Sequence, residues 1–149
     1  MANQDVKQPT LKQEDLRRFT GTAQYWKSGL PWHPFLYTDG VQYLAEVGQA
    51  YWLLDLIGSW QADPVIKNDP ILGEMQFWTL TVNENRSAVA ICERDSGDVA
   101  AKQVLGYTDF PLPKVRLYLA HMVCFWRYSS AQGPRTNADH GVLLLPSEY

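Results

Sequence analysis

The sequence has 149 residues, of which 46% are hydrophobic and 19% are charged. This size and composition predict one domain with a hydrophobic core, and they argue against a disordered tail or an integral membrane protein. The formal net charge of -3 argues against nucleic-acid binding driven by overall electrostatic attraction, although a local basic patch stays compatible with it.

The N-terminus is polar, with no basic start followed by an apolar stretch, and no long apolar run suited to spanning a membrane occurs in the chain. Cys92 and Cys124 form no Cys-x-x-Cys pair, and we interpret both as reduced. These features predict a cytoplasmic protein with no membrane partner. We expect a single domain over residues 1–149, with residues 1–9 as a flexible lead.

Two helices are predicted in the first part of the chain. Thr10 and Gln13 fit a capping box, which predicts a short helix that ends before Gly21. In residues 41–60, apolar residues recur at spacings of three and four, which predicts a longer helix. The second half of this helix is apolar on nearly every side, which indicates burial on several sides. The connection between the helices, residues 20–40, is rich in aromatic residues and proline, and we expect its aromatic side chains to anchor it.

After Gly73 the hydrophobic period changes to two, which is typical of strands separated by turns. The last two predicted strands are separated by residues 121–140, which we interpret as an insert. Two helices followed by such strands predict an α+β fold, in which the longer helix packs on an antiparallel meander sheet of about four to five strands. The expected strands are Met75–Val82, Ser87–Glu93, Val99–Thr108, Val115–Leu119 and Gly141–Leu145.

Several short segments along most of the chain also form a recognisable set: Leu16–Thr22, Phe35–Val41, Ala50–Asp55, Phe77–Val82, Tyr107–Leu112 and Leu143–Tyr149. Together they resemble an uncharacterised bacterial family of the domain-of-unknown-function type. In that family's pattern, the strand ending near Leu119 turns directly into the last strand, whereas this sequence carries Met122–Asp139 between them. The resemblance implies no activity and no catalytic residue.

Asp55 interrupts the apolar end of the longer predicted helix, so we expect a buried carboxylate at this position. Such a group would either be a tuned acid or base, or a structural carboxylate paired with Arg17, Arg18 or a loop donor. We favour the structural interpretation. Asp39 and Asp109 each follow Tyr-Thr, a setting that favours a capping or turn role.

The sequence supports no metal or cofactor site. His121 and Cys124 are three residues apart and His140 lies beside Asp139, but this spacing matches no standard zinc site. The nucleophile elbow, the P-loop and the dinucleotide-binding glycine motif are also missing. We therefore predict no metal, no cofactor and no catalytic residue.

Three functions stay open, and we favour a non-enzymatic module that binds a protein partner or a second copy. The first alternative is a small acid–base enzyme with a pocket under the 20–40 loop, using Asp55, Asp109 or His33. The second and less favoured one is a single-stranded nucleic-acid binder that uses a strip of arginine and aromatic residues including Arg116 and Tyr118. The predicted interaction surface consists of Trp26, Trp32, Phe35, Phe125, Trp126, Arg127 and Tyr128.

Overall fold

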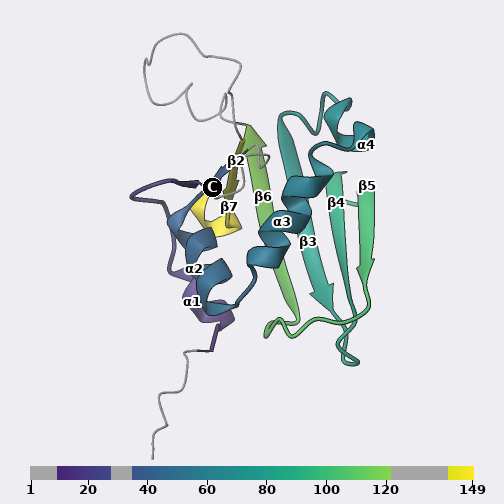
Figure 1. Cartoon of the computed structure of the whole chain (residues 1–149). Helices are drawn as coiled ribbons and strands as arrows, with labels where there is room; N and C mark the ends of the chain where they lie inside the picture. The colour runs from purple at the N-terminus through teal and green to yellow at the C-terminus, as the bar shows by residue number, and fades with distance from the viewer. Residues whose placement is uncertain (1–9, 28–34, 122–140) are drawn as a thin grey trace, which may run out of the picture.

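The computed structural model describes residues 10–27, 35–121 and 141–149, and these form an α+β fold (Figure 1). Its helices are α1 (Gln13–Arg17), α2 (Asp39–Val47), α3 (Tyr51–Trp60), α4 (Pro64–Lys67) and the 3-10 helix η1 (Pro146–Glu148). Its strands are β1 (Trp26–Lys27), β2 (Phe35–Tyr37), β3 (Met75–Val82), β4 (Ala88–Asp95), β5 (Asp98–Leu105), β6 (Lys114–His121) and β7 (Gly141–Leu144). Among the helices of these ranges, none is long and apolar enough to cross a membrane.

The strands form one seven-stranded sheet in the order β1-β2-β7-β6-β3-β4-β5. The predicted meander is correct for β3, β4 and β5, which are antiparallel neighbours. Two features of the prediction are wrong. The sheet is mixed, because β2 and β7 are parallel, and it has more than the four to five strands expected, because residues 20–40 supply β1 and β2.

The sheet also departs from the predicted order at β6, which pairs with β3 on the far side of the meander. The connection that leads to β6 is tied to the hairpin between β3 and β4 through Arg86. The Arg86 guanidinium donates to the carbonyl oxygens of Thr108 (3.0 Å) and Phe110 (2.7 Å), and the Arg86 carbonyl accepts from the Thr108 N–H. These bonds direct the chain past the end of the meander and back to β3.

The predicted long helix over residues 41–60 is two helices, α2 and α3, separated by a break at Gly48–Ala50. Gln49 in this break has a φ of 51°, a left-handed conformation that a continuous helix does not contain. A side chain at Gly48 would approach the Leu44 carbonyl oxygen to 2.7 Å, so the backbone is closely packed here. The break lets each helix pack on a different part of the sheet.

Helix α1 is shorter than predicted and begins after Lys12 rather than Thr10. The Asp15 carboxylate accepts from the N–H of the N-cap residue Lys12 (3.2 Å), as the acidic residue of a capping box does. The capping-box prediction paired Gln13 with Thr10. In the structure the Gln13 side chain instead donates to the carbonyl oxygen of Lys114 on β6 (2.9 Å). A contact across the fold has therefore replaced the predicted local one.

The helices pack on one face of the sheet, with α3 in front of β3 in Figure 1. Leu53 and Ile57 of α3 lie against Leu80 of β3 and Leu117 of β6, and all four side chains are buried. Trp60 at the end of α3 donates its indole N–H to Gln103 of β5 (2.7 Å). Residues of β3, β4 and β6 that point to this face form the main core.

The N-terminus of α2 is held by a polar cluster that we call the α2 cap: Thr38, Asp39, Gly40 and Glu148. The Glu148 carboxylate accepts from the Thr38 hydroxyl (2.6 Å), the Gly40 N–H (3.1 Å) and the Leu145 N–H (3.0 Å). An acidic side chain at this position also interacts favourably with the helix dipole. The α2 cap thus connects the C-terminal end of the fold to its first long helix.

Candidate functional site

Two of the seven predicted interaction residues lie in the described ranges, and both contribute to the fold. Phe35 in β2 is only 1% exposed, so it is a core residue and the prediction of an interface role is wrong. Trp26 in β1 is half-buried against the core, and its indole N–H donates to the Asp39 carboxylate (2.9 Å). The other five, Trp32, Phe125, Trp126, Arg127 and Tyr128, lie outside the described residues.

The prediction that Asp55 is a buried carboxylate is wrong, because this residue is exposed. Helix α3 is not buried on every side. Tyr51, Asp55 and Ser59 are spaced by four residues and form an exposed stripe along the helix, while Leu54 and Ile57 point into the core. The apolar residues around Asp55 concealed this stripe in the sequence.

The other candidate acid–base and nucleophilic groups in the described ranges are Asp39, Asp109 and Cys92. The Asp39 carboxylate accepts from the Trp26 indole and the Ala23 N–H, and these hydrogen bonds lower its pKa. Asp109 is exposed. Burial raises the pKa of the Cys92 thiol to about 12, so this residue stays protonated and unreactive.

The metal candidates and His33 of the enzyme alternative fall partly outside the described ranges. Of the histidine and cysteine set considered from the sequence, Cys124, Asp139 and His140 lie outside these ranges. Within them, no group of three or more His, Cys, Asp or Glu residues is arranged to hold a metal ion.

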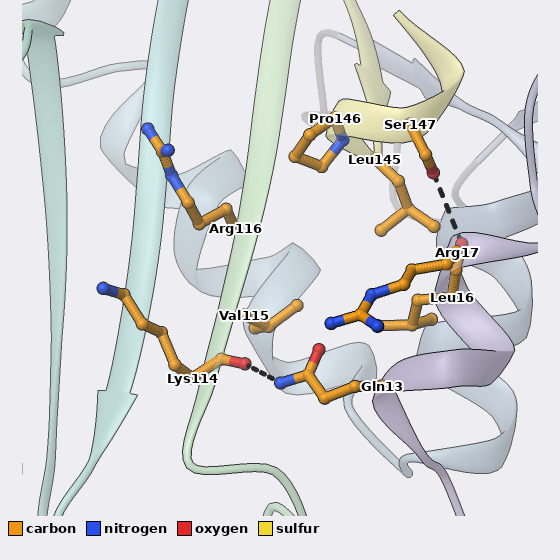
Figure 2. A pocket seen from close by; sticks show the side chains of 9 residues that line it. All are labelled: Gln13, Leu16, Arg17, Lys114, Val115, Arg116, Leu145, Pro146 and Ser147. Carbon is orange, nitrogen blue, oxygen red and sulfur yellow. Dashed lines mark hydrogen bonds between the residues drawn. The ribbon is translucent and has the colours of Figure 1, made fainter.

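A groove of about 410 Å³ lies between α1, the first half of β6 and η1 (Figure 2). Its apolar part comes from Leu16, Val115, Leu145 and Pro146. Its polar part comes from Gln13, Arg17, Lys114, Arg116 and Ser147. A site of this size with an apolar floor and a few polar groups is typical of ligand-binding clefts.

The groove exists because β7 is shorter than β6. The last pair between these strands is Tyr118–Leu144, after which Pro146 turns the chain away into η1. Residues 114–117 of β6 therefore have β3 on one side and no strand on the other. This free strand edge forms one wall of the groove.

The register shows which backbone groups face the groove. The Val82 N–H of β3 donates to the Pro113 carbonyl (2.8 Å), so Val82 and Pro113 are a hydrogen-bonded pair of the antiparallel ladder. In such a ladder, every second residue of β6 directs its N–H and carbonyl toward β3, and the residues between them direct theirs to the other side. Val115 and Leu117 consequently bond to β3, whereas the N–H and carbonyl groups of Lys114 and Arg116 point into the groove. The Gln13 side chain donates a hydrogen bond to the Lys114 carbonyl oxygen. Nothing in the described part of the chain bonds to the Arg116 N–H or carbonyl on that side.

The groove is cationic. Figure 2 shows the Arg17 guanidinium reaching from α1 toward Val115, while the Lys114 and Arg116 side chains extend from β6 away from α1. The lining contains no carboxylate. Two nearby acids are engaged elsewhere, because Asp15 pairs with Arg18 and Glu148 belongs to the α2 cap. Across the described ranges, no ion pair neutralises the groove's cations.

The groove opens beside the second face of the sheet, which we call the open face. It carries the side chains of β3, β4, β5 and β6 that alternate with the core residues, and within the described ranges no helix packs on its β4–β5 part. Val104, opposite Val89, is 69% exposed. The residues that pair across this face are Phe77 with Tyr118, Thr79 with Arg116 and with Ile91, Ile91 with Lys102, and Val89 with Val104.

Part of the open face is packed. Ala120, Val142 and Leu144 form a small buried cluster with Met75 and Tyr118 against it. Tyr118 also contacts Phe77 and Tyr149 edge-on, with ring centroids 5.0 and 5.9 Å apart. The open face is therefore aromatic and filled near β7, and aliphatic and exposed near β5.

The described residues form a small α+β domain with a cationic groove at the free edge of β6. A family model for a family of unknown function, DUF6876, matches residues 10–149, and the chain belongs to this family. No curated protein and no solved structure matches the chain. The family assignment confirms the resemblance seen in the sequence segments, and it brings no activity with it.

The sequence contained partial signals for the groove. Lys114, Arg116 and Tyr118 alternate along β6, and Arg116 and Tyr118 were placed in the arginine and aromatic strip. Pro146 directly follows the last expected strand, and a proline commonly ends a strand. Arg17 was considered only as a partner for Asp55, because nothing in the sequence indicates that α1 lies beside β6.

Proposed function

We propose that the chain is a non-enzymatic protein-interaction module whose contact surface is the open face of the sheet. The observation that carries this proposal is the exposed aliphatic part of that face around Val104, on the side of the sheet opposite α3. Exposed apolar surface on a sheet face is typical of a protein contact site. The contact surface thus differs from the loop and insert residues that the sequence pattern favoured.

The composition of the open face suits a protein partner. Aliphatic Val89, Ile91 and Val104 lie beside the cations Lys102 and Arg116, an arrangement that combines an apolar centre with a polar rim. Such a surface gains free energy from apolar burial, while the surrounding charges select the partner. A second copy of this chain is one such partner.

The nucleic-acid alternative receives less support from the same face. Base stacking requires a free aromatic ring face. The Tyr118 ring contacts its aromatic neighbours edge-on, and the Arg116 guanidinium lies 5.8 Å from its centroid. The groove beside β6 lends no support to an enzyme, because its lining contains no carboxylate, histidine or cysteine.

The test uses Val104→Glu, with Val65→Glu as the matched control. Val65 is also exposed (49%), and it lies on α4 rather than on the open face. Purified wild-type protein and both variants are compared by light scattering over a concentration series and by pull-down from a lysate of the source organism. We expect Val104→Glu to abolish dimer formation or stoichiometric capture of a specific protein, and Val65→Glu to preserve it.

Equal behaviour of the three proteins in both assays would contradict the proposal. A monomer that captures no protein would contradict it as well. Salt-sensitive binding of a single-stranded oligonucleotide, lost in Arg116→Gln and kept in Val104→Glu, would replace it with the nucleic-acid alternative.

A further inference from the structure

The groove beside β6 has a feature that a contact surface alone does not require, which is a strand edge with unused hydrogen-bonding groups. The Arg116 N–H and carbonyl and the Lys114 N–H point into it, while the Lys114 carbonyl already accepts from Gln13. Backbone donors and acceptors at the spacing of a strand are complementary to another extended backbone. Addition of a peptide strand to a sheet edge is a common recognition mode.

The side chains around this edge define what a bound strand would carry. Side chains of an added strand alternate between the two faces of the sheet and lie beside their cross-strand neighbours. Those on the open-face side would meet Lys114 and Arg116. The one on the core side would meet the apolar floor formed by Leu16, Val115 and Leu145.

The charge of the groove determines which side chains a bound strand would carry on the open-face side. Arg17, Lys114 and Arg116 surround the groove without a carboxylate in its lining, in a chain whose net charge is -3. An acidic side chain on the bound strand would form charge-assisted hydrogen bonds with these groups. An apolar side chain between two acidic ones would fill the floor.

We propose that the groove binds an extended acidic peptide segment of a partner protein, with acidic and apolar residues in alternation, as a short strand added to the free edge of β6. The free edge covers residues 114–117 of β6, or roughly 13 Å of strand. This inference deepens the proposed function, since it assigns a second contact of the same module, and it rests on that function only for the existence of a protein partner.

The probe is a fluorescein-labelled peptide of alternating Glu and Val with a C-terminal amide, titrated with the full chain and followed by fluorescence anisotropy. Two control peptides separate charge from strand pairing. One replaces each Glu by Lys, and the other carries N-methyl groups on alternate amides, which blocks pairing while the side chains stay the same. We expect saturable binding of the first peptide, none of the Lys peptide, and at least about tenfold weaker binding of the methylated one.

Two variants at one position separate the backbone from the side chain. Arg116→Gln removes the charge and keeps the N–H, whereas Arg116→Pro removes both. Proline is tolerated at an edge when its missing N–H is not part of the ladder, and the Arg116 N–H does not bond to β3. Arg116→Pro should therefore bind the peptide more weakly than Arg116→Gln while circular dichroism shows the same fold.

Arg17→Gln should weaken binding by about tenfold, and Lys67→Gln on α4 serves as a control that removes an exposed charge far from the groove. Equal affinity for the methylated and unmethylated peptides would overturn strand addition. Displacement of the peptide by acetate at the same carboxylate concentration would reduce the groove to a simple anion site and overturn it too. Dissociation of a dimer by the peptide would assign the edge to a second copy instead.

The failure of this inference is distinguishable from failure of the proposed function. Val104→Glu should leave peptide affinity unchanged, because Val104 lies on β5 and the groove is on the far side of β3. Arg17→Gln should leave contacts made by the open face unchanged. If the peptide does not bind and Val104→Glu still abolishes the protein contact, only the groove assignment is wrong.

Discussion

The α2 cap and the groove beside β6 are both polar regions next to η1, and they use their polar groups in opposite ways. In the α2 cap, Glu148 accepts three hydrogen bonds from groups of the same chain. In the groove, the Arg116 backbone and the cations have no such partners within the described residues. The same short segment of chain takes part in both regions.

The difference separates residues that hold the fold from residues available to a ligand. A buried polar group that is already satisfied is costly to change, because its partners are then left unsatisfied. A polar group that faces solvent in a groove is inexpensive to change for stability, and its contribution appears only on binding. Conspicuous motif residues such as Asp39 and Glu148 therefore belong to the fold, and less conspicuous ones such as Arg17 belong to the candidate site.

The largest effect is expected at Gly40 in the α2 cap. A side chain there would come within 2.6 Å of both the Glu148 carboxylate and the Leu145 side chain, so Gly40→Ala should force Glu148 out of position. We expect a loss of about 3 kcal/mol in the free energy of unfolding, measured with urea. Gly21→Ala is the control, because nothing lies within 4 Å of a side chain at that position. Equal stability of the two variants would show that the α2 cap is not rigid.

The second largest effect is expected when Glu148, the hydrogen-bond acceptor of the α2 cap, is removed. Glu148→Ala leaves the Thr38 hydroxyl and the Gly40 and Leu145 N–H groups without their acceptor, which should cost about 2 kcal/mol. Glu84→Ala removes the same type of side chain from an exposed turn and should change stability by less than about 0.5 kcal/mol. Similar urea midpoints for the two variants would contradict a structural role for Glu148.

Asp39 adds a pH dependence to the α2 cap. Hydrogen bonds from Trp26 and Ala23 hold its pKa below the unfolded value of 3.8. The ionised carboxylate therefore stabilises the fold above that value, and this contribution is lost as the pH falls through the lower, folded pKa. Asp39→Asn should cost about 1 kcal/mol at neutral pH, and the difference from wild type should shrink below pH 3.8. Stability curves that stay parallel in acid would exclude this contribution.

Local structure with a clear period was predictable from the sequence. Strands β3, β4, β5, β6 and β7 match the expected segments closely, because alternating apolar residues and turn residues such as Gly97 are local signals. Strands β1 and β2 are too short to show a period. The break at Gln49 is set by its left-handed backbone, which a glutamine does not signal.

Long-range arrangement was not predictable in the same way. The position of β6 beside β3 depends on the Arg86 contacts with Thr108 and Phe110, which connect residues far apart in the sequence. Aromatic residues such as Trp26 and Phe35 occur both in protein cores and at interfaces. The sequence alone therefore could not show which of the two places they occupy, and the fold was needed to decide. The edge of β6 at Arg116 is free because the pairing of β7 with β6 stops at Tyr118. The sequence does not show which residues of two strands pair, so it could not predict this edge.

The smallest effects on stability are expected in the groove, and they give the comparison its sharpest test. Arg17→Gln and Lys114→Gln each remove an exposed charge that makes no ion pair in the described ranges, so each should change the free energy of unfolding by less than about 0.5 kcal/mol. Urea unfolding of both variants beside Glu148→Ala measures this directly. A loss comparable to that of Glu148→Ala would mean that the groove's cations hold α1 against β6. An unchanged free energy of unfolding together with weaker peptide binding would show that these charges contribute to recognition and not to the stability of the fold.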